Sequence, residues 1–277
     1  MYRIVVNREL APKINLIEIC AEEVAKKAKP GQFVILRLDE KGERVPLTIA
    51  NRDEKKGTLT IVFHEVGNTT KKLGSLEKGD LISDVVGPLG NPAEINRYGR
   101  VLCVGGGVWV APLYFVALGL RGEGNKLVSV VGARTKDHLI FEKEMKEISD
   151  EFYVATDDGS KGYKGLDFLK DFVEKQKIDR VIVMGPVVMM QTVTEITRPC
   201  GLKTMVTLAP IMLDGMGMCG VCRVSVGGET KFACMDGPEF DGHLVDFEQL
   251  IHRQRLYLPE ERIASMLRGK LGGIKPG

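Results

Sequence analysis

Three of the six cysteines lie close together in the sequence. Cys219 and Cys222 are separated by two residues, and Cys234 follows with eleven residues between. Strand-like runs on both sides of Gly227-Gly228 predict a hairpin, because this dipeptide suits a two-residue turn. With these glycines at the turn, Cys222 lies opposite Ala233, and the three sulfurs come within bonding reach of one centre. The spacing therefore indicates a metal or redox site.

Three thiolates need a fourth ligand, and the sequence offers two candidates nearby. Asp214 precedes Cys219 by five residues, and His243 follows Cys234 by nine. Three thiolates with an imidazole suit zinc, whereas three thiolates with a carboxylate can hold an iron–sulfur cluster. The surrounding glycines favour the cluster, because their backbone amides can approach its sulfides. Zinc and ordinary unligated thiols remain open as alternatives.

The other cysteines, Cys20, Cys103 and Cys200, each stand alone in an apolar run. Free cysteine is commonly buried and packs as a small apolar side chain, so we expect these three to be buried and structural. In a reducing compartment, clustered cysteines indicate metal or redox chemistry before disulfides.

Short turns with glycine follow several predicted strands in the second half of the chain. Gly105-Gly106-Gly107 comes directly after the apolar run Val101–Val104, and such a turn lets a phosphate approach the free N–H groups of a helix N-terminus. Asp157-Asp158-Gly159-Ser160 and Gly185-Pro186 follow later strands, whose carboxyl ends share one edge of a parallel sheet. A nucleotide site is predicted at this edge, although the full G-x-G-x-x-G pattern is missing and purely structural turns are the alternative.

The elements that position these residues form two patterns. Short β-rich runs separated by turns predict a small antiparallel barrel in the first part of the chain. Strands that alternate with helices predict a parallel α/β sheet after it. The expected barrel strands are Asn15–Cys20, Gln32–Leu38, Pro46–Ala50 and Thr58–His64. The expected α/β strands are Val101–Val104, Leu127–Gly132, Glu151–Thr156, Arg180–Met184 and Lys203–Ala209, with helices over Ala111–Arg121, Asp137–Ser149, Gly165–Gln176 and Val187–Arg198.

Length and composition fit this arrangement. A chain of 277 residues predicts two domains with a small appendage, and 44% hydrophobic with 27% charged residues is typical of a globular protein. The formal charge of +2 is too balanced for binding to a phosphate backbone, so nucleic acid is not an expected partner.

The chain is expected to be cytoplasmic. Its first ten residues contain Arg3, Arg8 and Glu9 and lack the apolar core of a signal peptide. Val101–Leu120 has no charged residue and is long enough to cross a membrane, but its three glycines and Pro112 fit a buried strand and helix better. We expect no membrane association.

The order of barrel, glycine-turn domain and cysteine region resembles the ferredoxin reductase-like electron-transfer subunits. Among them are the electron-transfer subunit of dihydroorotate dehydrogenase B and the small subunit of NADH-dependent reduced ferredoxin:NADP oxidoreductase, also called sulfide dehydrogenase. The resemblance covers roughly Tyr2 to Phe247 and is carried by Gly105–Leu113, Thr156–Ser160 and Met184–Pro186. It implies an FAD-binding barrel over residues 1–97, an NAD-binding α/β domain over 98–209, a [2Fe-2S] region over 210–250 and a tail over 251–277.

The resemblance also implies roles for single residues. In the family, an Arg shortly before a Ser or Thr on a barrel strand meets the flavin pyrophosphate, and the hydroxyl lies near the reactive flavin nitrogen. Arg44–Thr48 resembles this element with one additional residue between Arg and hydroxyl. Val66–Thr70 resembles the second flavin loop, with Thr69 at the usual glycine.

The nicotinamide loop of the family reads G-G-G-x-G-x-A-P, and Trp109 stands at the last of these glycines. Arg134 follows the second strand of the sheet, where a 2′-phosphate could meet it. We interpret Arg134 as a solvated loop charge and expect NAD(H) rather than NADP(H).

The dihydroorotate-type ligand pattern is C-x4-C-x2-C-x(11–15)-C. Cys219, Cys222 and Cys234 match its last three positions, and Asp214 falls on the first. The sulfide dehydrogenase branch resembles this chain in using Asp there, which leaves His243 as a bystander.

The implied function is that of an NAD(H)-dependent flavin/iron–sulfur oxidoreductase subunit. It would pass electrons to a larger flavin/iron–sulfur catalytic subunit in NADH/ferredoxin:NADP oxidoreduction, a reaction in which electrons can be bifurcated. One alternative is the electron-transfer subunit of a dihydroorotate dehydrogenase, and another is a zinc-stapled, nucleotide-binding regulatory protein without redox activity. No catalytic side chain is expected, because the cofactors themselves transfer the hydride. The expected cofactor-binding residues are Arg44, Pro46, Leu47, Thr48, His64, Gly67, Thr69, Thr70, Gly105, Gly106, Gly107, Asp158, Gly159, Gly185 and Pro186, and the expected metal ligands are Asp214, Cys219, Cys222 and Cys234.

Overall fold

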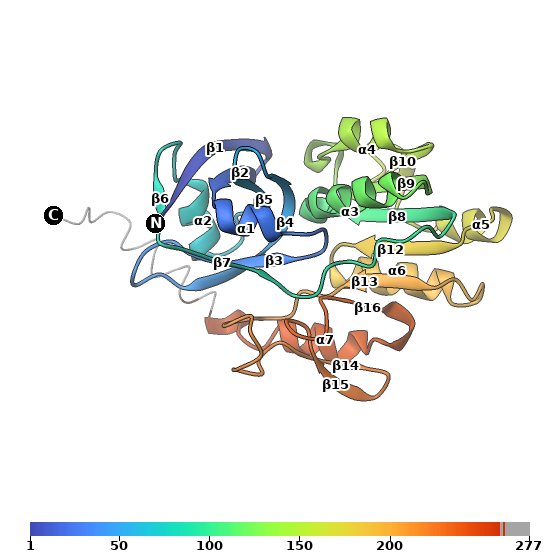
Figure 1. Ribbon diagram of the computed structural model, residues 1–277. Coiled ribbons are helices and arrows are strands. Elements are labelled where there is room, and N and C mark those ends of the chain that lie inside the picture. The colour runs from blue at the N-terminus through green and yellow to red at the C-terminus, as the bar shows by residue number, and fades with distance from the viewer. Residues whose placement is uncertain (261–262, 264–277) are drawn as a thin grey trace.

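The computed structural model describes residues 1–260 and residue 263. It contains two seven-stranded sheets and a separate two-stranded hairpin. The first sheet lies on the left in Figure 1, the second on the right, and the hairpin below them. Part of the expected tail, 251–277, lies outside the described residues.

The first sheet is antiparallel and strongly curved, with the strand order β6-β1-β2-β5-β4-β3-β7. Its inner face is apolar: Ile17, Ile49 and Ile61 are fully buried. The four strands predicted for the barrel are all present, and Thr58–His64 has the predicted bounds. The elements are β1 (Tyr2–Ala11), β2 (Ile14–Cys20), α1 (Glu22–Lys27), β3 (Phe33–Arg37), β4 (Arg44–Asp53), β5 (Thr58–His64), α2 (Asn68–Gly74), β6 (Leu81–Ile82) and β7 (Asp84–Leu89).

The second sheet has the order β11-β10-β9-β8-β12-β13-β16, and all its strands except β16 run parallel. Helices α3 and α4 cover one face, and α5 and α6 cover the other (Figure 1). Its elements are β8 (Arg100–Gly106), α3 (Val110–Gly122), β9 (Lys126–Ala133), α4 (Glu142–Ile148), β10 (Glu151–Thr156), β11 (Tyr163–Lys164), α5 (Phe168–Lys175), β12 (Arg180–Met184), α6 (Val187–Thr197), β13 (Thr204–Thr207) and β16 (Glu239–Asp241).

Two predicted helices are shorter than expected. Within the run Asp137–Ser149, the α-helix covers only Glu142–Ile148, because Phe141 before it adopts a left-handed conformation with φ of 57° and packs near Tyr114, with ring centroids 5.6 Å apart. The helix predicted from Gly165 begins at Phe168, since Gly165 is also left-handed with φ of 66°. In the first case, packing of an aromatic ring outweighs the local helical preference.

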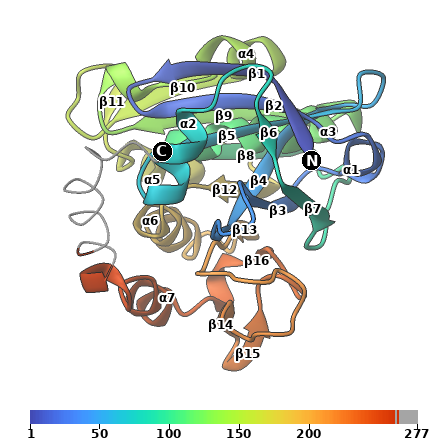
Figure 2. The same cartoon turned by 90° about the vertical axis from the view of Figure 1, so that its left-hand side faces the viewer.

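The cysteine region lies in the chain between β13 and β16 of the second sheet. Strands β14 (Arg223–Val226) and β15 (Glu229–Phe232) form the predicted hairpin, with Gly227 and Gly228 both at positive φ. Arg223 pairs with Phe232, and Ala233 N–H donates to the Cys222 carbonyl at 3.1 Å, as the predicted register requires. Viewed from the barrel side, this hairpin and α7 (Phe247–Gln254) project below both sheets (Figure 2).

The isolated cysteines do not behave alike. Cys103 lies in the buried strand β8, as expected, but Cys20 and Cys200 are exposed. Cys20 is the last residue of β2, and Cys200 lies in the turn after α6. Both are exposed despite their apolar neighbours in the sequence, because they lie where an element ends at the surface.

Two apolar clusters connect the parts of the molecule. One joins barrel residues such as Ile14 and Val62 to α3, and the other joins barrel residues Phe33 and Ile35 to Cys222 and Cys234. Among the described residues, no helix has the length and apolar character needed to cross a membrane, which leaves Val101–Leu120 as the strand and helix that its glycines and proline favoured.

Candidate functional site

A cleft of about 600 Å³ lies between the barrel and the carboxyl edge of the parallel sheet. Strands β8 and β12 are neighbours at its base, and their chain continuations run to opposite sides of the sheet. Open α/β sheets bind ligands at such a switch point. The cleft is lined by Ile14, His64, Gly106, Gly107, Val108, Trp109, Gly132, Ala133, Arg134, His138, Ala155, Asp157, Gly165, Leu166, Pro186, Val188, Met189 and Thr192.

The three glycines at the end of β8 have different surroundings: Gly105 and Gly106 are its last residues, and Gly107 follows it. A Cβ on Gly105 would come within 2.8 Å of the Leu113 side chain, so this glycine permits close packing of α3 on the sheet. Gly107 has φ of 58°, and a Cβ on it would meet no atom within 4 Å, so its backbone is open to a ligand. Trp109 follows directly and lines the same cleft. Of the predicted turn, Gly107 therefore offers the accessible backbone.

The turn after β10 contributes a residue that the sequence analysis did not select. Asp157 lines the cleft, whereas Asp158 and Gly159 do not. The Asp158 carboxylate accepts the Ser160 backbone N–H at 2.9 Å, and bonds to Ser160 lower the pKa of Asp158. Asp157 and Asp158 belong to the same predicted turn, and only the tertiary structure shows that Asp157 is the one that lines the cleft.

The barrel reaches into the cleft through His64. This residue ends β5 and pairs with Ile14, next to the β1–β2 turn. Burial lowers the pKa of His64, and the positive charges of Arg134, His138 and Lys13 lower it further. His64 is thus the predicted cofactor residue that connects the barrel to the nucleotide edge.

The predicted flavin strand is β4. Successive side chains along this strand point alternately to its two faces and so form two sets. Val45 and Leu47 pack against the barrel core. Arg44, Pro46 and Thr48 therefore project from the opposite, outer face of the strand. Leu47 can meet a flavin on that face only through its backbone.

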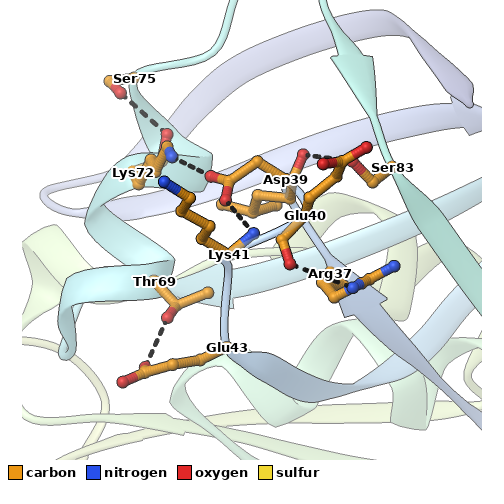
Figure 3. Close-up of polar contacts among 10 residues, drawn as sticks. Arg37, Asp39, Glu40, Lys41, Glu43, Thr69, Lys72, Ser75 and Ser83 are labelled. Carbon is orange, nitrogen blue, oxygen red and sulfur yellow. Dashed lines mark hydrogen bonds and ion pairs between the residues drawn. The ribbon is translucent and has the colours of Figure 1, made fainter.

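The second predicted flavin loop begins α2. Gly67 N–H donates to Thr70 Oγ1 at 3.0 Å, and that hydroxyl donates back to the Gly67 carbonyl at 3.1 Å. Thr70 is buried and stabilises the start of the helix, whereas Thr69 Oγ1 donates to Glu43 Oε2 at 2.9 Å (Figure 3).

The loop before β4 closes against the same helix. The Lys72 ammonium pairs with the Asp39 carboxylate (Figure 3). A cavity of about 350 Å³ lies between this loop and the first turn of α2. Thr69 thus faces a space next to the strand that carries Arg44.

Two of the predicted metal ligands are in direct contact. The Sγ atoms of Cys222 and Cys234 are 3.2 Å apart, and both side chains are buried. Burial raises the pKa of the Cys234 thiol to about 12, and the neighbouring Cys222 adds to the effect. A thiol of this kind ionises readily only beside a cation, which fits a pair of iron ligands.

The other two predicted ligands form a second pair. The Asp214 carboxylate accepts the backbone N–H of Cys219 at 2.6 Å and that of Met216 at 2.9 Å. The bond from Met216 is the main cause of the lowered pKa of Asp214, which keeps this carboxylate ionised as a hard oxygen ligand. Gly217 N–H bonds to the Cys234 thiol, so the loop also directs an amide at sulfur.

This two-plus-two arrangement fits a [2Fe-2S] cluster, in which each iron takes two protein ligands. A single zinc ion is less well served. In the described chain, no three His, Cys, Asp or Glu residues gather closely enough to hold one metal ion. His243, the fourth ligand that zinc would need, lies with Nε2 3.2 Å from Thr197 Oγ1 on α6. His243 therefore does not join the three cysteines as the zinc alternative requires.

The ligand loop rests directly on the barrel. A Cβ on Gly215 would lie 2.9 Å from the Leu89 side chain and 3.1 Å from that of Ile35. Ile35 pairs with Pro46 on the predicted flavin strand, and Phe33 pairs with Thr48. The loop of the cysteine region therefore contacts β3, the strand directly next to β4 in the barrel.

Comparisons with known proteins agree with this geometry. Residues 209–246 match the family described as the iron–sulfur cluster binding domain of dihydroorotate dehydrogenase B. A homologue of the electron-transfer subunit of dihydroorotate dehydrogenase B from Thermotoga maritima is 48% identical over 264 residues, which cover 92% of this chain and 93% of that protein. The electron-transfer subunit from Geobacillus thermodenitrificans is 35% identical, with 86% and 94% covered.

Solved structures extend the comparison. The structure of an NADH-dependent reduced ferredoxin–NADP oxidoreductase, studied for flavin-based electron bifurcation, superposes with a TM-score of 0.90 at 46% identity and covers 96% of this chain and 97% of its own. Phthalate dioxygenase reductase shares the fold, with a TM-score of 0.58 at 18% identity over 81% of this chain and 85% of its own.

Barrel, parallel sheet and cysteine hairpin define an electron-transfer oxidoreductase subunit of the ferredoxin reductase class. The chain belongs to the family of the dihydroorotate dehydrogenase B electron-transfer subunits and their homologues. Fold, family and the matched iron–sulfur domain support FAD, NAD(H) and a [2Fe-2S] cluster as its cofactors. The expected fold class and class of activity are thereby confirmed.

Proposed function

We propose that this chain moves electrons between NAD(H) and a larger flavin/iron–sulfur subunit in NADH/ferredoxin:NADP oxidoreduction. The observation that carries the proposal is the ionised Asp214 carboxylate beside Cys219, where the dihydroorotate-type pattern has cysteine. The similarity over nearly the whole chain to the NADH-dependent reduced ferredoxin–NADP oxidoreductase supports the same choice.

When bound, FAD would supply hydride exchange with NADH and one-electron exchange with the [2Fe-2S] cluster. The residues of this chain serve to hold and orient these groups. Arg44 and Thr48 would bind the flavin from the outer face of β4, with Gly67 and Thr69 at the second loop. Gly107, Pro186 and Asp157 would position the dinucleotide at the sheet edge.

The surface around the cysteine pairs favours a protein partner. Four large apolar side chains of this region are about half exposed or more: Leu213 at 51%, Met216 at 48%, Met218 at 84% and Met235 at 53%. Exposed apolar residues that cluster in this way mark interaction sites, and flexible Met side chains adapt to a partner surface. A catalytic subunit docked here would receive electrons directly from the cluster.

The test is the cofactor content of the anaerobically purified chain. The wild type should contain one flavin, two irons and two labile sulfides. Asp214→Ala should lose most of its iron and keep its flavin, because the carboxylate lies in the cysteine region and not at β4. Asp246→Ala serves as a matched control, since this aspartate caps α7 in the same region.

An iron content in Asp214→Ala equal to that of the wild type would show that Asp214 is not a ligand of the cluster. A colourless wild-type protein would refute the proposal as a whole.

A dihydroorotate dehydrogenase subunit is the second candidate, supported by the names of the family relatives. The partner that co-purifies from native cells decides between the two. Reduction of NADP⁺ by NADH together with reduced ferredoxin supports the first candidate, and NAD⁺-dependent oxidation of dihydroorotate supports the second.

A further inference from the structure

Three basic side chains line the cleft and a fourth lies next to one of them, and we call the four the basic rim: Lys13, His64, Arg134 and His138. His64 comes from the barrel, whereas Arg134 and His138 follow β9, and all three line the cleft. Lys13, in the β1–β2 turn, adds its positive charge at His64. Each of the two domains therefore contributes two basic groups to one opening.

The basic rim has little negative charge of its own. Within residues 1–260, Lys13 and Arg134 form no ion pair with a carboxylate. Glu65 is adjacent to His64 in sequence, but its carboxylate accepts the Asn15 amide at 2.5 Å and packs against Gly74. Asp157 is the acidic side chain that lines the cleft. Positive charge thus outweighs negative charge at the opening.

The imidazoles leave donors available. The Nδ1 atom of His138 lies 2.9 Å from Thr135 Oγ1, which occupies one ring nitrogen. The imidazole of His64 has no hydrogen-bond partner within the described chain, although its backbone carbonyl accepts the Val66 N–H at 2.8 Å. Basic groups that face one another across a cleft repel, and a bound anion removes this repulsion.

We propose that the basic rim holds the diphosphate of the nicotinamide dinucleotide, with His64 and Arg134 contacting it from opposite domains. The inference rests on the proposed function, which supplies NAD(H) as the ligand. Side chains are needed here because Gly107 alone offers open backbone at the turn, and Trp109 replaces the glycine that follows in the family.

The diphosphate is favoured over a 2′-phosphate by Asp157. Its backbone N–H donates to the Ala133 carbonyl at 3.1 Å, next to Arg134 in the chain, and Asp157 and Arg134 both line the cleft. A carboxylate there accepts a bond from a free ribose hydroxyl and repels a phosphate in its place. The same geometry favours NAD(H) over NADP(H).

Binding of the diphosphate should take up a proton. Without ligand, burial and the charges of Arg134, His138 and Lys13 lower the pKa of His64, while Glu65 opposes them. A bound dianion favours the imidazolium and raises this pKa, so affinity for NAD⁺ should increase as pH falls from 8 to 6.

The experiment is calorimetric titration of the full, FAD-loaded chain with NAD⁺ and with NADP⁺, in two buffers of different ionisation enthalpy. Arg134→Gln should weaken both ligands by the same factor, about tenfold, because a charge-assisted bond to phosphate is lost. His64→Gln should weaken NAD⁺ and abolish the buffer-dependent proton uptake. Arg97→Gln and His252→Gln are matched controls at exposed positions outside the cleft and should bind as the wild type does.

Three results would count against the proposal. Binding of NAD⁺ within twofold of wild type in both Arg134→Gln and His64→Gln would overturn it. Selective loss of NADP⁺ binding in Arg134→Gln would show that Arg134 contacts the 2′-phosphate instead of the diphosphate, and this result would also overturn the proposal. Failure of the wild type, with flavin and iron in place, to bind either dinucleotide would refute the proposed function and the basic rim together. Unchanged flavin content and thermal unfolding show that the variants are folded.

Discussion

At the scale of single residues, neighbours decide what a buried thiol can do. Burial raises the pKa of Cys103 and of Cys234 to about 12. Cys103 lies in β8 among apolar side chains, where a neutral thiol packs well. The Sγ atom of Cys234 lies 3.2 Å from a second sulfur, so a metal ion bound by both would stabilise the two thiolates and offset the free energy needed to ionise them. The same shift accompanies packing at Cys103, whereas at Cys234 it fits the predicted role as a metal ligand.

His64 provides a prediction at this scale. Its pKa is lower in the folded protein than the ordinary value near 6.5, so the folded form resists protonation that the unfolded form accepts. The free energy of unfolding of the unliganded chain should therefore fall as pH decreases below about 7. His64→Gln should show a smaller fall between pH 7.5 and 5.5, measured as urea midpoints.

His252→Gln, an exposed control, should keep the wild-type pH dependence. Equal pH dependence in His64→Gln and wild type would contradict the interpretation of His64.

At the scale of elements, turns place the ligands. The loop between Asp214 and Cys219 contains Gly215 at φ of 71° and Gly217 at φ of 82°. These left-handed glycines let the loop fold back, so that the Asp214 carboxylate accepts two backbone N–H groups from later residues of the same loop. The loop then presents its carboxylate and amides on one side and rests on β3 and β7 with the other.

Gly215→Ala tests this contact. The new Cβ meets Leu89 and Ile35 and forces a left-handed alanine, so both packing and backbone conformation are disturbed. We expect a loss of more than about 1 kcal/mol in the free energy of unfolding and a reduced ratio of iron to flavin, measured by chemical denaturation and metal analysis.

Gly228→Ala is the matched control, because this glycine has φ of 80° but open space around it. It should lose about 1 kcal/mol and retain its iron. Equal iron loss in both variants would show that the barrel contact of Gly215 is unimportant.

At the scale of the whole molecule, the segment between the barrel and the second sheet joins all three parts. Glu94 pairs with the buried Arg180 of β12 at 2.8 Å, and the Arg180 guanidinium lies 4.5 Å from the centre of the Tyr98 ring. Asn91 N–H donates to the Gly237 carbonyl at 2.7 Å, next to the cysteine region. Burial raises the pKa of Glu239, which lies near the same junction.

Arg180→Gln should weaken this junction. It removes the pair with Glu94 and the contact with Tyr98, and we expect a loss of about 1–3 kcal/mol in the free energy of unfolding, since buried charge-assisted bonds are lost while Glu94 remains partly exposed to water. The exposed Arg97→Gln in the same segment should change stability by less than about 0.5 kcal/mol. Thermal or urea unfolding measures both, and equal stability of the two variants would contradict the role given to Arg180.

Much of the local structure was predictable because its signals are local. The strands Thr58–His64, Glu151–Thr156 and Arg180–Met184 have the predicted bounds, since alternating or continuous apolar runs end at turn residues. The hairpin register followed from Gly227-Gly228, because a two-residue turn leaves one pairing. The resemblance then gave the class of protein from a few motifs.

The sequence by itself determined the order of barrel and parallel sheet and the register of the hairpin between Cys222 and Cys234, and it predicts the set of sulfur and oxygen ligands. The tertiary structure alone decided that Asp157 rather than Asp158 faces the cleft, that Cys20 and Cys200 are exposed, and that His64 meets Arg134 across two domains. It also placed Ile35 against the ligand loop at Gly215. These contacts join residues far apart in the chain, and no local pattern encodes them, because packing of whole elements fixes which surfaces meet.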